Sequence, residues 1–295
     1  MKRSRSTVIL FILIFAALLF SDDYVQSVEA WRQQRINNLK RPDGWLSLIG
    51  LFWLREGENS FGSDSGNDLV FPDDKADPFL GVFILNDGAV TVRAATGADI
   101  RCHGERVSTL PLIADDGEPT ILTHRSLLFY VIKRGDRFGI RLKDTESDLL
   151  KRFKGIDCYP IDPSWAIPAR FQPYDSGKTI HVVNALGQTT REACPGALIF
   201  VRNGQEYRLD IVGQGESEYF IVFGDATNGE STYGGGRFLY VPRPDAEGKT
   251  VIDFNKSYNP PCVFTPYATC PLPPPQNILP FPVTAGEKMF EGGHH

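Results

Sequence analysis

The chain has 295 residues, of which 42% are hydrophobic and 23% are charged. This is the composition of an ordinary globular protein, and it excludes a wholly disordered chain, a collagen-like chain and a membrane protein with many spans. With 31 Lys and Arg against 36 Asp and Glu, the net charge is −5. Such a surface does not attract phosphate backbones by its bulk charge, so we expect no nucleic-acid partner.

The first 21 residues have the features of an export signal. Lys2, Arg3 and Arg5 precede an apolar run over residues 8–20, and Ser-Asp-Asp follows it at 21–23. A basic start, a short apolar stretch and a polar exit are typical of segments that direct export, and a spanning helix needs a longer run of about 20 residues. We therefore predict an exported protein, periplasmic or secreted. Residues 1–21 are either cleaved or remain as an anchor, and only the uncleaved segment would contact a membrane.

Residues 22–44 are predicted to form an N-terminal helix and a linker. Acidic residues at the start of this segment and basic residues near its end match the charges of a helix dipole, and apolar residues recur between them. The sequence Pro42-Asp43-Gly44 ends the helix because proline and glycine interrupt the helical pattern.

After residue 44 the sequence changes to short apolar runs separated by turn residues. The dense apolar run at 45–54 contains Gly50, which predicts a strand with a bulge. The turn residues Asp87-Gly88 predict a tight hairpin between residues 79–85 and 89–94, and a second hairpin is predicted at 127–143.

A short helical piece at 147–153 separates these strands from a second series. Further strands are predicted at residues 156–161, 179–183, 197–202, 207–212, 219–223, 238–241 and 251–254. Many short strands at intervals of roughly 8–12 residues are typical of an antiparallel sandwich or barrel. We therefore predict a mainly β protein with one β half at 45–145 and a second at 146–295, the second ending in a Pro-rich loop.

Long motifs in the second half resemble a known protein family. They are Phe-Gly-Asp-Ala-Thr at 223–227, Thr-Tyr-Gly-Gly-Gly-Arg-Phe-Leu-Tyr at 232–240, Asp-Phe-Asn-Lys at 253–256, Tyr-Asn-Pro-Pro-Cys at 258–262 and the Pro-rich run at 264–275. Together they closely resemble the uncharacterised bacterial family known as domain of unknown function 1684. The segment 43–64 looks similar to the same family. The resemblance implies no reaction, substrate or cofactor.

The first half is similar to the opening strands of forkhead-associated phosphothreonine readers. This likeness lies in Gly57 to Asp64, a polar loop and the hairpin that ends near Val92. In those modules an arginine after the glycine and a Ser-x-x-His motif hold the phosphate, whereas Ser63 follows Gly62 here. We therefore expect a forkhead-associated-like β half at 45–145 without phosphopeptide binding.

The loop at 225–237 is the strongest candidate for a functional site, because it is longer than a hairpin turn needs and carries acids, hydroxyls and an arginine. Polar residues that follow the next strand could reach the same end of the sheet. We predict a polar ligand-binding pocket between the 225–237 and 253–270 loops, lined by Asp225, Thr227, Glu230, Tyr233, Arg237, Asp253, Asn255 and Tyr258.

These residue types leave several functions open. Arg237 could hold the carboxylate or phosphate of a small molecule, with tyrosine rings as an aromatic wall. The carboxylates could instead act as the catalytic pair of a hydrolase on a glycan, or bind calcium together with Asn255. In a structural envelope protein the same residues would only cap turns and pair with one another. No catalytic residue is assigned, and the sequence leaves open whether the chain is an enzyme.

The chain contains 5 Cys, an odd number. Exported proteins commonly form disulfides, and Cys262 and Cys270, which are close in sequence within the Pro-rich loop, are the candidate pair. The alternative is that both are buried thiols. Because no Cys-x-x-Cys occurs, we expect no structural zinc site.

Overall fold

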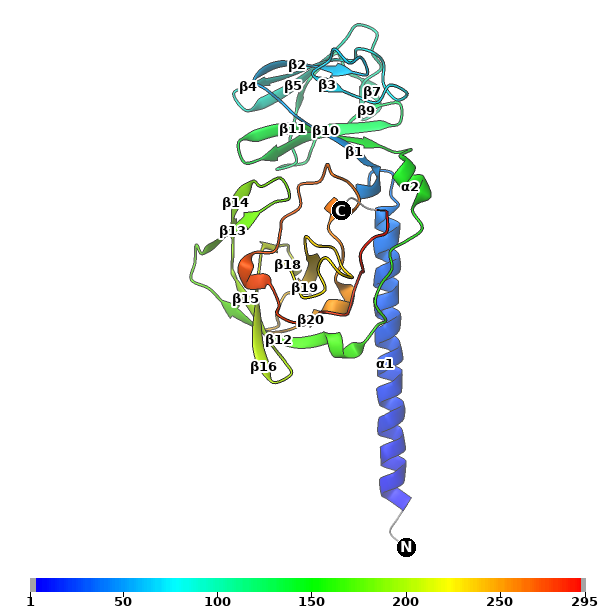
Figure 1. Cartoon of the computed structure of the whole chain (residues 1–295), viewed down its shortest axis with the longest axis vertical. Coiled ribbons are helices and arrows are strands. Elements are labelled where there is room, and N and C mark those ends of the chain that lie inside the picture. Colours follow the sequence, from blue (N-terminus) through cyan, green and yellow to red (C-terminus); the bar gives the residue numbers. More distant parts are fainter. Residues whose placement is uncertain (1–3, 293–295) are drawn as a thin grey trace. The chain divides into compact units, whose positions relative to one another are not determined.

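The computed structural model describes the backbone of residues 4–292 and the side chains of residues 22–292. The predicted mainly β architecture, with several antiparallel sheets and an N-terminal helix, is confirmed (Figure 1). The described chain divides into two compact units. We call them the first β unit, Leu39–Lys154 with Phe264–Ala268, and the second β unit, the described parts of Met1–Asn38, Gly155–Val263 and Thr269–His295.

The N-terminal helix, α1 (Ser4–Leu39), packs onto the second β unit through residues at helical spacing. Val28 is 0% exposed, the rings of Trp31 and Tyr258 have centroids 6.2 Å apart, and Arg35 forms an ion pair with Glu287. The side chains of the predicted export signal, residues 1–21, lie outside the described residues. Among the residues that are described, no helix has the length and apolar character of a membrane span.

Two sheets enclose the core of the first β unit. One has the strand order β1-β11-β10-β9-β6-β7, and the other has the order β3-β2-β4-β5-β8. Their bounds are β1 (Leu48–Trp53), β2 (Gly57–Gly62), β3 (Leu69–Val70), β4 (Gly81–Asn86), β5 (Ala89–Ala94), β6 (Arg101–Cys102), β7 (Glu105–Arg106), β8 (Thr109–Leu112), β9 (Leu122–His124), β10 (Leu127–Arg134) and β11 (Arg137–Asp144).

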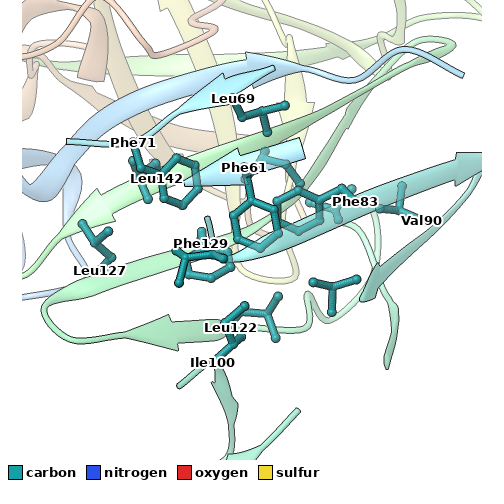
Figure 2. Close-up of a cluster of buried hydrophobic side chains, with 14 of the residues drawn as sticks. Phe61, Leu69, Phe71, Phe83, Val90, Ile100, Leu122, Leu127, Phe129 and Leu142 are labelled. Atoms are coloured by element: carbon teal, nitrogen blue, oxygen red, sulfur yellow. The ribbon is translucent and has the colours of Figure 1, made fainter. Parts of the chain in front are cut away.

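Aromatic side chains from both sheets meet in this core (Figure 2). The ring of Phe61, on β2, lies 5.9 Å from that of Phe129, on β10, and Phe83, on β4, lies 6.2 Å from Phe129. Because each strand alternates between core and opposite face, the neighbours of Phe129 on β10 point away from this core. The two sheets therefore form a sandwich around one hydrophobic centre.

The local elements predicted in this unit are present. Asp87 and Gly88 join β4 to β5 with φ angles of 48° and 79°, which is the primed turn that a two-residue hairpin requires. The bulge predicted at Gly50 appears as a register shift between Leu48 and Gly50 in the pairing of β1 with β11. The predicted short helix is α2 (Asp148–Arg152), whose first turn is capped by the side chain of Ser147.

The second β unit is built from a sheet of order β16-β15-β12-β20, a sheet of order β17-β18-β19, and the hairpin β13-β14. The bounds are β12 (Ala166–Pro173), β13 (Thr179–Val183), β14 (Thr189–Ala193), β15 (Gly196–Arg202), β16 (Gln205–Asp210), β17 (Gly213–Gln214), β18 (Glu218–Phe223), β19 (Arg237–Pro242) and β20 (Lys249–Asp253). Apolar residues of both sheets and of the C-terminal segment form its core, with Val283 and Ala285 both 0% exposed.

The strand predictions for this unit need correction, because residues 156–161 form no strand and β12, β14 and β17 were not predicted. Residues 156–161 form no strand in the described structure but make an isolated bridge from Cys158 to Glu287, since prolines at 160 and 163 cannot donate to a ladder. In contrast, β12, which contains Pro168 and Pro173, was not among the predicted strands. It nevertheless pairs with both β15 and β20, because burial between two strands outweighs its weak local preference for a strand.

Candidate functional site

Asp225 and Arg237 stand at the two ends of the predicted functional loop, between β18 and β19. The Arg237 Nη2 atom lies 2.9 Å from Asp225 Oδ2, and both side chains are 0% exposed. Burial lowers the pKa of the Arg237 guanidinium, and the Asp225 carboxylate opposes this effect. A buried charge needs such a partner because removal from water is costly. The two residues predicted to bind a ligand therefore bind each other.

The same two side chains hold the C-terminal segment. Arg237 donates hydrogen bonds to the carbonyl oxygens of Val283 at 2.8 Å, Ala285, and Glu287 at 3.3 Å. Asp225 Oδ1 accepts a hydrogen bond from the Val283 amide at 3.0 Å. These contacts fix residues 283–287 against the sheet. A ligand would reach Asp225 or Arg237 only after this segment is displaced.

The other predicted residues of the loop occupy different environments. Thr227 is buried, and its hydroxyl donates to Asp225 Oδ1 at 2.6 Å. Glu230 is exposed to solvent, so it does not form a carboxylate pair with the buried Asp225. Tyr233 is half-buried, and its pKa is raised by burial and by the nearby sulfurs of the candidate disulfide pair.

Asp253, Asn255 and Tyr258 lie together at a second place, beside α1. Asp253 ends β20 and caps the short 3-10 helix η3 (Phe254–Lys256). The Tyr24 hydroxyl donates to Asp253 Oδ1 at 2.8 Å, and Asn255 Nδ2 donates to the Tyr24 oxygen at 2.9 Å. Burial and the Asp253 carboxylate raise the pKa of Tyr24, so its phenol stays protonated as the donor. Lys256 Nζ lies 3.5 Å from Asp253 Oδ2.

A cavity of about 330 Å³ opens beside this carboxylate. Aromatic rings form part of its wall: Tyr240 is 49% exposed, and its ring is stacked on Tyr258 at 6.1 Å and 17°. The cavity thus combines apolar ring faces with carboxylates and one ammonium group. Its lining residues are Tyr24, Trp31, Ala166, Glu218, Tyr240, Pro242, Val251, Asp253 and Lys256.

Asp253 was a predicted site residue, whereas Tyr24 and Trp31, which α1 contributes to this cavity, were not. Tyr24, Val28, Trp31 and Arg35 recur at intervals of three or four residues, which places them on one face of a helix. This spacing, in the polar part of α1 after residue 21, is the signal that could have identified Tyr24 and Trp31. The ligand-binding role of the predicted residues stays a prediction. These residues lie at two separate places, the buried Asp225–Arg237 pair and the cavity at Asp253.

Cys262 and Cys270 are close to each other in the second β unit. The Cys262 amide donates to Cys270 Sγ at 3.0 Å, and the Cys270 amide donates to Cys262 Sγ at 3.3 Å. The two sulfurs are therefore neighbours, and the disulfide between them stays a prediction.

The calcium alternative required the carboxylates and Asn255 to gather at one place. Asp225 is instead engaged by Arg237, and Asp253 by Tyr24 and Lys256. In the described part of the chain, no group of three or more His, Cys, Asp or Glu side chains is arranged to hold a metal ion.

Comparison with known proteins gives a family and a solved structure. The family model described as "Protein of unknown function (DUF1684)" matches residues 151–288, which confirms the resemblance drawn from the motifs in that range. The likeness of residues 43–64 to the same family lies outside the match and stays a prediction.

One solved structure that is similar to the chain is a solution NMR structure of an uncharacterised protein from gene locus rrnAC0354 of Haloarcula marismortui. Its sequence is 27% identical, the match covers 47% of this chain and 78% of that chain, and the TM-score is 0.40. No curated protein matches the chain.

Proposed function

We propose that the second β unit, which carries most of the residues matched by the DUF1684 model, binds a small saccharide in the cavity at Asp253. The observation that carries this proposal is that aromatic rings and the Asp253 carboxylate line the same cavity. The Oδ2 atom of that carboxylate can accept a further hydrogen bond. Ligand cavities of proteins typically have mostly apolar walls and a few placed polar groups, and this cavity has both.

The hydrogen bonds around Asp253 support a hydroxyl-bearing ligand. Its Oδ1 atom already accepts from Tyr24 and from the Asn255 amide at 3.2 Å. Within the described residues, Oδ2 is approached only by Lys256, at 3.5 Å. A carboxylate oxygen can accept more than one hydrogen bond, so Oδ2 is free to accept from a ligand hydroxyl. The Lys256 ammonium can donate to another oxygen of the same ligand.

The rings and the volume favour a sugar over a purely charged ligand. Trp31 and Tyr240 line the cavity, and such rings have apolar faces and polar edges, a combination that suits ligands with one apolar and one wet side. The cavity volume of about 330 Å³ lies near the lower end of the roughly 300–1,000 Å³ range of ligand pockets. It therefore suits a small molecule more than a long polymer.

We expect Asp253→Asn and Trp31→Leu to weaken saccharide binding. Asp253→Asn removes a charged acceptor, worth about 1.5–3 kcal/mol in such hydrogen bonds, so the Kd should rise about tenfold or more. The measurement is isothermal titration calorimetry with the sugars that raise the Tm in a panel of mono- and oligosaccharides. Glu247→Gln, which neutralises an exposed acid in the loop before β20, is the matched control and should leave the Kd unchanged.

Absence of binding across the panel, or equal affinity in wild type and both variants, would contradict the proposal. The hydrolase alternative predicts a further outcome, because Glu218 and Asp253 line the same cavity. Release of new reducing ends from the bound sugar, lost in both Glu218→Gln and Asp253→Asn, would identify that activity.

We also propose that the chain is exported. Among the described residues, Tyr24 is the first residue of α1 that lines the cavity, so cleavage after Ser21 would keep every described lining residue. Intact-mass analysis of the protein from its native cell should find a mature N-terminus at Asp22, or an uncleaved chain in the membrane fraction. A chain that retains Met1 in the soluble cytosolic fraction would refute export.

The forkhead-associated likeness of residues 45–145 stays a proposal about architecture alone. Its support is the pair of sheets that face each other across the core of the first β unit. We propose no phosphopeptide function for this unit, because the arginine and the Ser-x-x-His motif of those readers have no counterpart here.

A further inference from the structure

Two cations lie side by side on β11, on the face opposite the core of the first β unit. Ile140 and Leu142 enter the core, so the alternation along the strand directs Arg141 and Lys143 to the other face. Tyr130, directly opposite Arg141 on β10, lies on this face as well. The sheet therefore presents a basic pair next to an aromatic ring.

A second ring completes this cluster. The Arg141 Cζ atom lies 5.2 Å from the centroid of the Trp45 ring and 6.0 Å from that of Tyr130. The Lys143 Nζ atom lies 5.7 Å from the Trp45 centroid and 5.6 Å from that of Tyr130. Both cations thus gain from the electron-rich ring faces, but these rings carry no charge that neutralises them.

Within the described residues neither cation forms an ion pair, and the carboxylate that acts on Lys143 is that of Asp43. Arg141 is 4% exposed, and its Nε has no hydrogen-bond partner among the described residues. Lys143 donates to the main-chain carbonyl of Asp43. The carboxylate of Asp43 is engaged by Arg41 at 2.9 Å. A buried N–H without an acceptor beside a second positive charge is costly for a folded protein.

The electrostatics of Lys143 reflect this surplus of positive charge. Burial and the neighbouring Arg141 lower the pKa of Lys143 to about 8. The Asp43 carboxylate raises the pKa of Lys143, and Arg41, like Arg141, lowers it. Arg41 and Lys143 thus share the Asp43 carboxylate while Arg141 adds a further positive charge beside Lys143. An oxyanion would supply both the missing charge and the missing acceptor.

We propose that Arg141 and Lys143 form a binding site for an oxyanion, the phosphate or carboxylate group of a small ligand, with Trp45 and Tyr130 at its sides. The planar guanidinium can donate from Nε while the ammonium donates to a second oxygen of the same group, as in other sites that recognise phosphate and carboxylate. This site is distinct from the saccharide cavity, because it belongs to the first β unit and has the opposite charge.

The proposal includes a pH dependence. The groups that face Lys143 are Arg141, Asp43, Arg41 and the rings of Trp45 and Tyr130. The pKa of Arg41 is raised and that of Asp43 is lowered, so both keep their charges between pH 7 and 9. Loss of the Lys143 proton above pH 8 should therefore weaken anion binding. A bound anion should in turn raise the pKa of Lys143, because the two equilibria are linked.

The first experiment compares the Tm of the full-length chain in phosphate, in acetate and in chloride at equal ionic strength. Phosphate stabilises many proteins without a specific site, so the informative quantity is the difference between variants. The Tm of the wild type should be higher in phosphate or acetate than in chloride. In Arg141→Gln and Lys143→Gln this difference in Tm should disappear. Arg137→Gln is the matched control, because Arg137 lies on the same strand and stacks on Trp53 but is exposed.

The second experiment follows the Lys143 side chain of the wild-type chain by NMR during a pH titration. In chloride its pKa should be about 8, and saturating phosphate should raise it by about one unit, which is a tenfold difference in anion affinity between the two protonation states. Acetate distinguishes the source: an effect of both anions indicates a general oxyanion site, and an effect of phosphate alone indicates a phosphate site. Equal Lys143 pKa values in all three salts, or an equal phosphate gain in wild type and Arg141→Gln, would overturn the proposal.

Discussion

Arg237→Ala is expected to lower the free energy of unfolding by about 3–5 kcal/mol, the usual effect of removing one partner of a buried ion pair. The loss has two parts. The Asp225 carboxylate would remain buried without its cation, and three carbonyl oxygens of the C-terminal segment would lose their donor. The denaturant midpoint should fall accordingly, and the Tm should fall by roughly 10 °C for a unit of this size.

The matched control for this variant is Arg243→Ala. Arg243 is also in the second β unit, and its guanidinium donates to the Gly215 carbonyl at 2.7 Å, but the side chain is exposed. Substitutions at such surface positions usually change stability by no more than about 0.5 kcal/mol. An unchanged midpoint for Arg237→Ala would contradict the structural role assigned to the buried pair and would return Arg237 to the candidates for ligand binding.

Phe61→Ala is expected to destabilise the first β unit by about 3–5 kcal/mol, which is the usual cost of truncating a phenylalanine in a core. Phe61 is 0% exposed, its ring is stacked on Phe83 at 4.2 Å, and it also contacts Phe71 and Phe129 (Figure 2). Truncation would leave a cavity between the two sheets that these rigid neighbours cannot fill.

Hydrogen exchange followed by mass spectrometry can place this effect within the chain. Because the two units have separate cores, peptides of β2, β4 and β10 should exchange faster in Phe61→Ala, while peptides of β15 and β18 should change less. Phe79→Ala is the control, since Phe79 is 51% exposed, and it should leave exchange in both units near the wild-type rate. Equal acceleration in both units would show that they unfold together.

Elements that depend on neighbouring residues could be predicted from the sequence. Asp87-Gly88 requires only that two consecutive residues adopt positive φ angles, and the Ser147 cap requires only a side chain that reaches the Leu150 amide. Such interactions act within a few residues, so the same residues favour the same turn or cap in many folds. The mainly β character, the N-terminal helix and the family motifs at 223–275 follow from patterns of this kind.

The tertiary structure alone decided which polar groups became buried and which line a cavity. The Val283 amide, which donates to Asp225 Oδ1, is 58 residues from Asp225 in the sequence. The Tyr24 hydroxyl, which donates to Asp253, is 229 residues from Asp253. Asp225 lies just after β18 and Asp253 is the last residue of β20, so both acids lie at the end of a strand and local patterns cannot separate them. The two acids differ because the C-terminal segment covers the carboxylate of Asp225, whereas α1 lies beside that of Asp253. Burial therefore excludes water from Asp225 and leaves Asp253 in the wall of a cavity.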